Sequence, residues 1–261
     1  MSAAVTTTIR PDSAVLDKAV QVAQELSLPF IARQKNSIEQ LIRQNNLKGA
    51  LVIGKNKSIY TDGQVELFFH PGMAKLRIKE ILAGKTDQMI KAMDLQPGDT
   101  VLDCTLGLAA DAIVASFAVG ENGSVTGLEN STLLAWLVKE GLTSYQDREM
   151  PAMNRAMRRI KVLPADHLTY LSALPSESVD VVYFDPMFRY PLWRSSAMLP
   201  VRPLADQRPV SEAALREALR VARKRVVVKE TRDSKEFSRL CINEVSGGKH
   251  SPIAFGIIKK K

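Results

Sequence analysis

From residue 100 onward, short apolar runs alternate with segments whose apolar residues recur at helical spacing. The apolar runs predict strands over residues 100–103, 124–128, 160–163, 179–184 and 225–228. Between them, the spacing predicts helices over residues 110–119, 133–142 and 211–223. This alternation with short loops is typical of an α/β fold with a doubly wound, mostly parallel sheet. Around Gly247-Gly248, residues 241–245 and 253–258 predict a hairpin of antiparallel edge strands.

The chain before residue 84 has a different pattern, in which short strands are separated by Gly, Asn and Asp. Strands are expected over residues 28–31, 50–54, 58–61 and 65–69. Helices are expected over residues 12–25, 37–45 and 72–83, and the next helix, over residues 86–93, lies beyond residue 84. We place a boundary near Gly84-Lys85, which gives a small N-terminal α/β domain of residues 1–84 and a main domain of residues 85–261.

The amino-acid composition indicates which kinds of partner to expect. Lysine and arginine number 36 against 28 aspartates and glutamates, and the net charge of +8 favours a polyanion, most simply nucleic acid. Two cysteines and three histidines nearly exclude a structural zinc site, so we expect no metal. The first residues lack the pattern of a signal peptide, and no apolar run approaches the roughly 18 residues of a membrane span. We therefore expect a cytoplasmic protein with no membrane partner.

Acidic residues follow four successive predicted strands. These are Asp103, Glu129, Asp166 and Asp185. Ligands of open α/β sheets bind outside the carboxyl ends of the strands, where these side chains would gather. The first loop has Gly107 but lacks the G-x-G-x-x-G that brings backbone close to a pyrophosphate. An acidic loop instead suits a ligand with an ammonium and a sulfonium group, such as S-adenosylmethionine.

Each of these residues has an expected role toward that cofactor. Asp103 and Asp111 would order its methionine part, with Gly107 allowing close approach. Glu129 would accept both ribose hydroxyls, and Asp166 would accept the adenine amino group. Taken singly, each carboxylate is better explained as a turn or helix-cap residue, but the set in register favours the cofactor.

The sequence Asp185-Pro186-Met187-Phe188 indicates the reaction. Methylating an exocyclic amino group is difficult because its lone pair is delocalised into the ring. A carboxylate and an adjacent backbone carbonyl can accept both N–H bonds and orient that nitrogen. Phe188 could stack on the base, as in enzymes that act on an extruded base. The alternative is a strand that ends at Pro186, with Phe188 in the core.

Basic and aromatic residues follow this motif. Arg189, Tyr190, Trp193 and Arg194 lie in a segment, extending to Arg208, whose composition suits a substrate-binding lid. Phosphate contacts combined with stacking are how looped RNA is usually held. Lys229, at the end of the last predicted parallel strand, joins these candidate substrate-binding residues. For Arg216, Arg220 and Arg223, a solvated helix face is the better interpretation.

Several motifs together resemble the RsmJ-like family of class I S-adenosylmethionine-dependent methyltransferases, which have a Rossmann-like fold. The similarity lies in residues 103–112, including Thr105, in the Glu129 strand end, in residues 181–188 and in residues 225–229; Arg77 is similar to a linker region of the family. The resemblance implies cofactor contacts at Ala110-Asp111, Glu129-Asn130, Asp166-His167 and Asp185. The family has Arg where this chain has Ala110, and a Pro- and Lys-rich stretch where it has residues 189–194, which indicates a diverged branch.

The resemblance and the strand-end residues together predict an S-adenosylmethionine-dependent RNA methyltransferase. Its expected target is the N2 atom of a guanine in small-subunit ribosomal RNA, as the family resemblance implies. One alternative is a methyltransferase that acts on DNA or a small amine. The other is a non-catalytic nucleic-acid-binding protein on the same scaffold, which the four strand-end carboxylates disfavour because they would repel phosphate.

Overall fold

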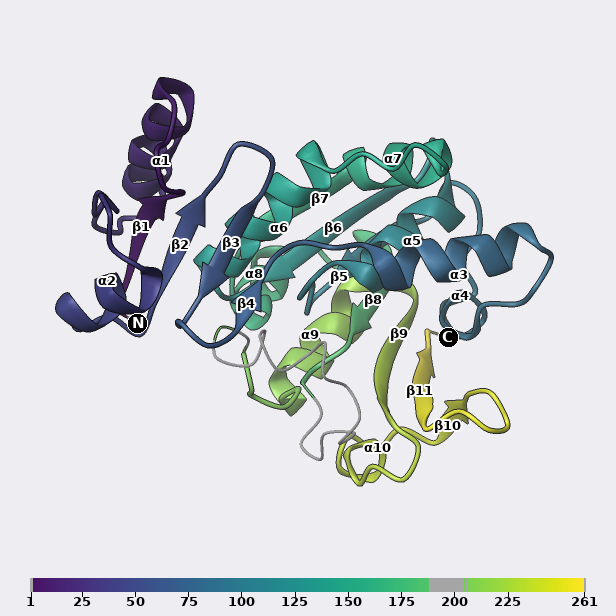
Figure 1. The fold of residues 1–261 in the computed structure, drawn as a ribbon. Coiled ribbons are helices and arrows are strands. Elements are labelled where there is room, and N and C mark those ends of the chain that lie inside the picture. Colours follow the sequence, from purple (N-terminus) through teal and green to yellow (C-terminus); the bar gives the residue numbers. More distant parts are fainter. Residues whose placement is uncertain (1, 188–203, 205, 261) are drawn as a thin grey trace. The chain divides into compact units, whose positions relative to one another are not determined.

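The chain forms two compact units, each with its own sheet (Figure 1). The structure is a computed structural model that describes residues 2–187, 204 and 206–260. The first unit extends to His70, and the second comprises the remaining described residues from Pro71. The boundary expected near residue 84 lies inside the second unit, because helix α3 (Gly72–Leu82) packs against helix α5 (Ala110–Val119).

The first unit has a four-stranded sheet in the order β1-β2-β3-β4, with β1 parallel to β2 and the other pairs antiparallel. Its elements are β1 (Ala3–Thr7), α1 (Ser13–Glu25), α2 (Ile38–Gln44), β2 (Gly49–Ile53), β3 (Ser58–Thr61) and β4 (Glu66–Leu67). Asp12 caps α1 as predicted, accepting a hydrogen bond from the Val15 amide at 2.9 Å. Strand β1 was not predicted, and the expected strand 28–31 is reduced to one bridge between Phe30 and Val5.

The second unit is built on a seven-stranded sheet in the order β10-β11-β9-β8-β5-β6-β7. Its strands are β5 (Thr100–Asp103), β6 (Ser124–Glu129), β7 (Ile160–Pro164), β8 (Val179–Phe184), β9 (Ala222–Thr231), β10 (Glu244–Ser246) and β11 (Ile253–Lys259). The five strands from β9 to β7 are parallel, and the β10–β11 hairpin adds antiparallel strands at one edge. The prediction of a mostly parallel sheet with a closing hairpin is confirmed.

Helices cover both faces of this sheet (Figure 1). Besides α3 and α5, they are α4 (Gln88–Met93), α6 (Thr132–Ser144), α7 (Pro151–Arg158), α8 (His167–Ala173), α9 (Glu212–Val221) and α10 (Glu236–Arg239). On one face α5 packs against α3, α4 and α7, and on the other α8 packs against α9. In the described part of the chain, no helix combines the length and apolar character that crossing a membrane requires.

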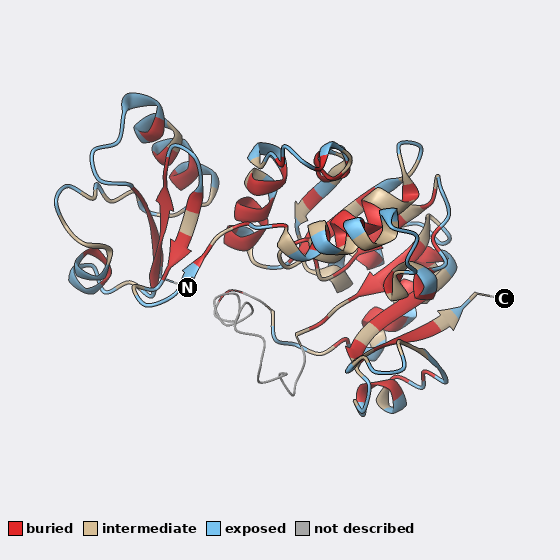
Figure 2. Ribbon diagram, turned by 45° about the vertical axis from the view of Figure 1, so that its right-hand side comes forward, coloured by how far each residue is buried: buried red, intermediate tan, exposed pale blue. Residues whose placement is uncertain are grey.

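The two faces of the sheet differ in chemistry near the carboxyl ends of the strands. Figure 2 shows the central strands buried, as the apolar runs predict. On the face toward α8 and α9, Leu102, Val182 and Val228 join one continuous apolar cluster. Alternate residues of a strand point to opposite faces, so Asp103, Tyr183 and Lys229 turn toward α5. Polar groups from three strands are thereby directed to one place.

The Leu134→Ala substitution should lower the free energy of unfolding of the second unit by about 2–5 kcal/mol, because a cavity replaces the lost side chain. Leu134 lies in α6 and is fully buried. The matched control, Leu82→Ala in α3, removes the same atoms from a residue that is 63% exposed. It should change stability by less than about 0.5 kcal/mol. Urea denaturation followed by circular dichroism measures both, and equal losses would contradict the burial of α6.

Candidate active site at the carboxyl ends of the strands

The parallel register brings the predicted carboxylates to one edge of the sheet. Asp103 pairs with Tyr183, and Phe184 pairs with Val228 on the next strand, so Asp185 stands level with Lys229. Asp103 and Glu129 are buried at the ends of β5 and β6. Asp111 opens helix α5 directly after the first loop.

A buried ammonium group lies at the centre of this arrangement. Lys229 Nζ donates to an oxygen of Asp111 at 2.9 Å and to Oδ2 of Asp185 at 2.8 Å. Asp111 also accepts the Tyr183 hydroxyl at 2.7 Å and the Arg77 guanidinium. One carboxylate from a helix therefore connects strands β8 and β9 with helix α3.

Arg77 extends the network to helix α4. Its Nε and one terminal nitrogen donate to the two oxygens of Asp87, at 2.7 and 2.9 Å. Asp87 is the N-cap of α4 and accepts the amides of Met89 and Ile90. A bidentate pair of this kind fixes geometry as well as charge, so α3, α4 and α5 are held together beside the site.

The network gives its carboxyl groups different pKa values. Burial favours the neutral form of Asp111, but Lys229 and Arg77 outweigh it and hold the pKa of Asp111 well below its usual range. For Asp185, burial raises the pKa to about 6, with Lys229 opposing the rise and Asp111 adding to it. For Asp103, burial raises the pKa to about 8. At neutral pH Asp103 is therefore mostly protonated, and the site carries less negative charge than the sequence indicates.

The first loop is fixed on both sides of Gly107. Thr105 donates its amide to Asp103 at 3.0 Å, and its hydroxyl oxygen accepts the Asp185 amide at 2.5 Å. The Gly107 amide donates to Glu129 at 3.2 Å. Gly107 has a left-handed φ of 49°. Among the described residues, the space beside its Cα is open, and the Thr105 carbonyl oxygen lies 3.9 Å from the position of a Cβ.

Strand β6 provides the surface against which this loop packs. The Leu106 amide donates to the Leu128 carbonyl at 2.9 Å. At Gly127 a Cβ would lie 2.4 Å from a methyl group of Leu106, so only glycine leaves room for that side chain. The loop and the Glu129 strand end are therefore one packed unit.

Glu129 organises the turn that follows β6. Its second oxygen accepts the Ser131 amide at 2.9 Å, and burial raises the pKa of its carboxyl group. Asn130, next to it, is exposed, and Ala110 at the start of α5 is half-buried. A carboxylate oxygen can accept two hydrogen bonds, so Glu129 retains capacity for a ligand's hydroxyl groups.

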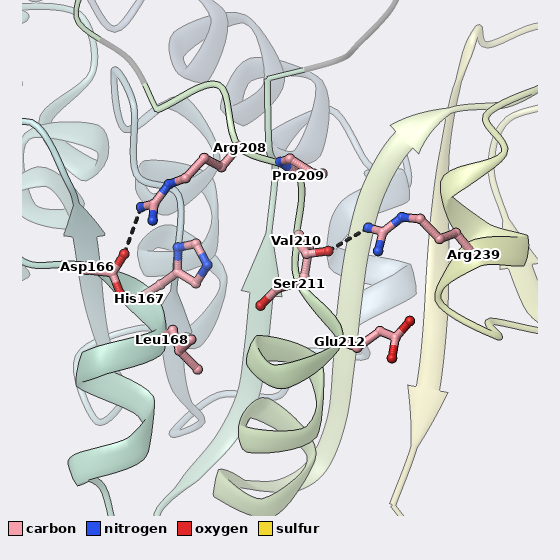
Figure 3. Close-up of a pocket in the computed structure, with 9 residues that line it drawn as sticks. All are labelled: Asp166, His167, Leu168, Arg208, Pro209, Val210, Ser211, Glu212 and Arg239. Carbon is pink, nitrogen blue, oxygen red and sulfur yellow. Dashed lines mark hydrogen bonds and ion pairs between the residues drawn. The ribbon is translucent and has the colours of Figure 1, made fainter.

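Asp166 caps helix α8 beside a pocket of about 450 Å³ (Figure 3). One of its oxygens accepts the Thr169 amide at 3.0 Å, and the other accepts Arg208 at 2.7 Å. These two bonds lower the pKa of Asp166 to about 2. The His167 ring meets Phe184 edge-on, and its burial lowers the pKa of the imidazole. In Figure 3, Asp166 and Leu168 face a chain segment that runs from Arg208 to Glu212.

The structure locates most of the predicted site residues. It brings Asp103, Asp111 and Asp185 around Lys229 and places Glu129 against the first loop. Pro186 is buried directly after Asp185. The candidate substrate-binding and stacking residues Phe188, Arg189, Tyr190, Trp193 and Arg194 lie outside the described residues.

Two members of the network, Tyr183 and Asp87, were not predicted at all, and a third, Arg77, was named only as similar to a linker region of the family. Tyr183 carries a hydroxyl group within the apolar run 181–184, and that exception was the available signal. Asp87 lies in a segment that only the fold brings to the sheet edge. Among the described residues, no three His, Cys, Asp or Glu side chains group as metal ligands do.

The chain is similar to several known proteins. Residues 21–251 match the family described as "Putative SAM-dependent methyltransferase". The chain is 41% identical to "Uncharacterized protein YpiP" of Bacillus subtilis, over 98% of both chains. It is 32% identical to "Ribosomal RNA small subunit methyltransferase J" of Pseudomonas aeruginosa, over 80% of this chain and 78% of the relative.

A solved structure shows the same fold. It is a SAM-dependent methyltransferase from Neisseria gonorrhoeae, with a TM-score of 0.68, 19% sequence identity and coverage of 98% of this chain and 95% of that one. The family match spans most of the chain and includes every strand of the parallel sheet. The chain therefore belongs to the RsmJ-like class I methyltransferases, which use S-adenosylmethionine as their methyl donor.

Proposed function

We propose that this methyltransferase modifies an exocyclic amino group of RNA, and that its target is a guanine N2 in small-subunit ribosomal RNA. The observation that supports this most is Asp185-Pro186 at the end of β8, bonded to the first loop through Thr105. The relative named "Ribosomal RNA small subunit methyltransferase J" supports the choice of RNA. The net charge of +8 agrees with a polyanionic substrate in the cytoplasm.

The residues at the strand ends fit the cofactor. S-adenosylmethionine supplies a methyl group on a positively charged sulfur. Glu129 and Asn130 would hold its ribose, and Asp166 with His167 would hold its adenine. The residues proposed for its methionine part are Asp103, Thr105, Gly107, Ala110 and Asp111. The open space beside Gly107 provides for the close approach that this assignment requires.

Asp185 is the proposed catalytic residue, and it has two tasks. Its carboxylate and the backbone carbonyl of Pro186 would accept the two N–H bonds of the target amino group, which aims the nitrogen lone pair at the methyl donor. As the nitrogen bonds to the methyl carbon, the carbon–sulfur bond of the donor would break and leave a neutral thioether, S-adenosylhomocysteine. The nitrogen would become positively charged, and Asp185 would take the proton that it loses. Phe188 would stack on the base.

RNA would be held by the segment after this motif. We assign Arg189 and Arg194 to phosphate contacts and Tyr190 and Trp193 to stacking, as in other proteins that bind unpaired RNA. Lys229 was predicted among these substrate contacts. Its two carboxylate partners in the structure indicate a different task, which is developed below.

Methyl transfer to defined substrates tests the proposal. Purified protein and radiolabelled S-adenosylmethionine are incubated with small ribosomal subunits, naked ribosomal RNA, DNA or a pool of small amines, and the nucleosides are then identified by mass spectrometry. We expect N2-methylguanosine in the RNA from one or both ribosomal samples. Label only in DNA or amines would refute an RNA substrate. RNA binding without any transfer or cofactor affinity would favour the non-catalytic alternative.

The Asp185→Ala variant should lose at least about 100-fold in kcat, because it removes the acceptor of the amino group and its proton. Calorimetry should show cofactor affinity within about threefold of wild type. The matched control is Asp180→Ala on the same strand, where the carboxylate binds Thr100 away from the site. Methylation by Asp185→Ala at the rate of this control would exclude the catalytic role.

Glu129→Ala should weaken S-adenosylmethionine binding about tenfold or more, because a buried charged acceptor of the ribose hydroxyls is lost. Glu121→Ala, at an exposed position before β6, serves as its control and should leave the affinity unchanged. Isothermal titration calorimetry measures both dissociation constants. Equal affinity in the two variants would rule out the ribose assignment.

A further inference from the structure

Strand β9 carries a lysine near each end, and each lysine is paired with an acidic group. At the start of the strand Lys224 pairs with Asp99, which is 5% exposed. At the other end the Lys229 side chain, 20% exposed, bridges Asp111 and Asp185. Of these two lysines, only Lys229 contacts the proposed catalytic residue, Asp185. The ion pair of Lys224 lies at the opposite end of the strand, which makes Lys224 a suitable control for Lys229.

The contact leaves Asp185 accessible. Lys229 approaches Oδ2 of Asp185 at 2.8 Å, while 28% of the Asp185 side chain remains exposed. The backbone of Asp185 is fixed independently by its amide bond to Thr105. A carboxylate that an ammonium group binds through one oxygen, and whose side chain remains partly exposed, can still accept hydrogen bonds from a ligand.

We propose that Lys229 is a positioning residue for methyl transfer, which holds the Asp185 carboxylate in place and in its charged, proton-accepting form. The inference rests on the proposed function, because it takes Asp185 as the acceptor of the target amino group.

In the described part of the chain, the titratable groups around Asp185 come from five elements. They are Lys229 on β9, Asp111 on α5, Asp103 at the end of β5, Tyr183 on β8 and, behind Asp111, Arg77 on α3. Burial and the negative charge of Asp111 favour protonated Asp185, and Lys229 opposes both. Asp103 contributes little charge at neutral pH because its pKa is about 8. Arg77 is already shared between Asp87 and Asp111.

Removing the ammonium group of Lys229 should therefore raise the pKa of Asp185. Asp111 would keep Arg77 and Tyr183 as partners, stay ionised and repel a charge on Asp185. The pKa of Asp185, about 6 with Lys229 present, would rise and leave the residue protonated at neutral pH. A protonated acid donates its hydrogen, and it cannot take a proton from the methylated nitrogen.

The pH dependence of kcat tests this in wild type, Lys229→Met, Lys229→Gln, Lys229→Arg and the control Lys224→Met. In Lys229→Met and Lys229→Gln, the midpoint of the rise of kcat with pH should lie about one to three pH units higher than in wild type, because Asp185 loses an adjacent opposite charge. Much of the lost rate should return at alkaline pH. Lys229→Arg and Lys224→Met should keep the wild-type profile. A rate lowered equally at every pH in Lys229→Met and Lys229→Gln would overturn the proposal.

A second measurement needs neither RNA nor activity. The carboxyl carbons of aspartate are labelled with carbon-13, and Asp185, identified by its loss in Asp185→Asn, is titrated by NMR in wild type and in Lys229→Gln. A higher titration midpoint in the variant supports the proposal, and an unchanged midpoint refutes it even if RNA is methylated normally. Failure of wild type to methylate RNA would count against the proposed function alone.

Discussion

The ammonium group of Lys229, held between a helix carboxylate and a strand-end carboxylate, is the interaction that the rest of the site depends on. Removing a charge from water is costly, and buried ions persist where partners surround them. Here the partners come from register: Phe184 opposite Val228 puts Asp185 beside Lys229, and α5 starts where Asp111 can reach the same nitrogen. The first loop is then attached to Asp185 through Thr105.

The carboxyl groups at the edge of the sheet differ in charge state and in partners, so they do not form a row of four equal negative charges. Asp103 is mostly neutral, Asp111 is balanced by Lys229 and Arg77, and Asp166 is paired with Arg208. Glu129 and the exposed side of Asp185 are left to interact with a ligand. A site of this kind can recognise a cationic nucleoside through a few placed oxygens, without a large repulsive field toward RNA.

Much of the second unit could be predicted, because the parallel strands appear in the sequence as short apolar runs and an acidic residue follows four of the five. Strand β1 was missed because Ala3–Thr7 is short, because four of its five residues are alanine or threonine, and because its burial depends on pairing with the distant β2. Helix α7 was obscured by its arginines, of which Arg158 donates to the carbonyls of Leu142 and Tyr145. Contacts such as Arg77 with Asp111 join segments that no local pattern connects.

Gly127 determines the shape of the site although it lies behind the first loop and not in it. It lies within β6 and contributes no functional group, yet the Leu106 side chain occupies the volume that any larger residue would need. A methyl group there would displace Leu106 and, with it, the peptide that carries Gly107. The shape of the first loop therefore depends on a residue that faces no ligand, and a description restricted to ligand-contacting residues would overlook it.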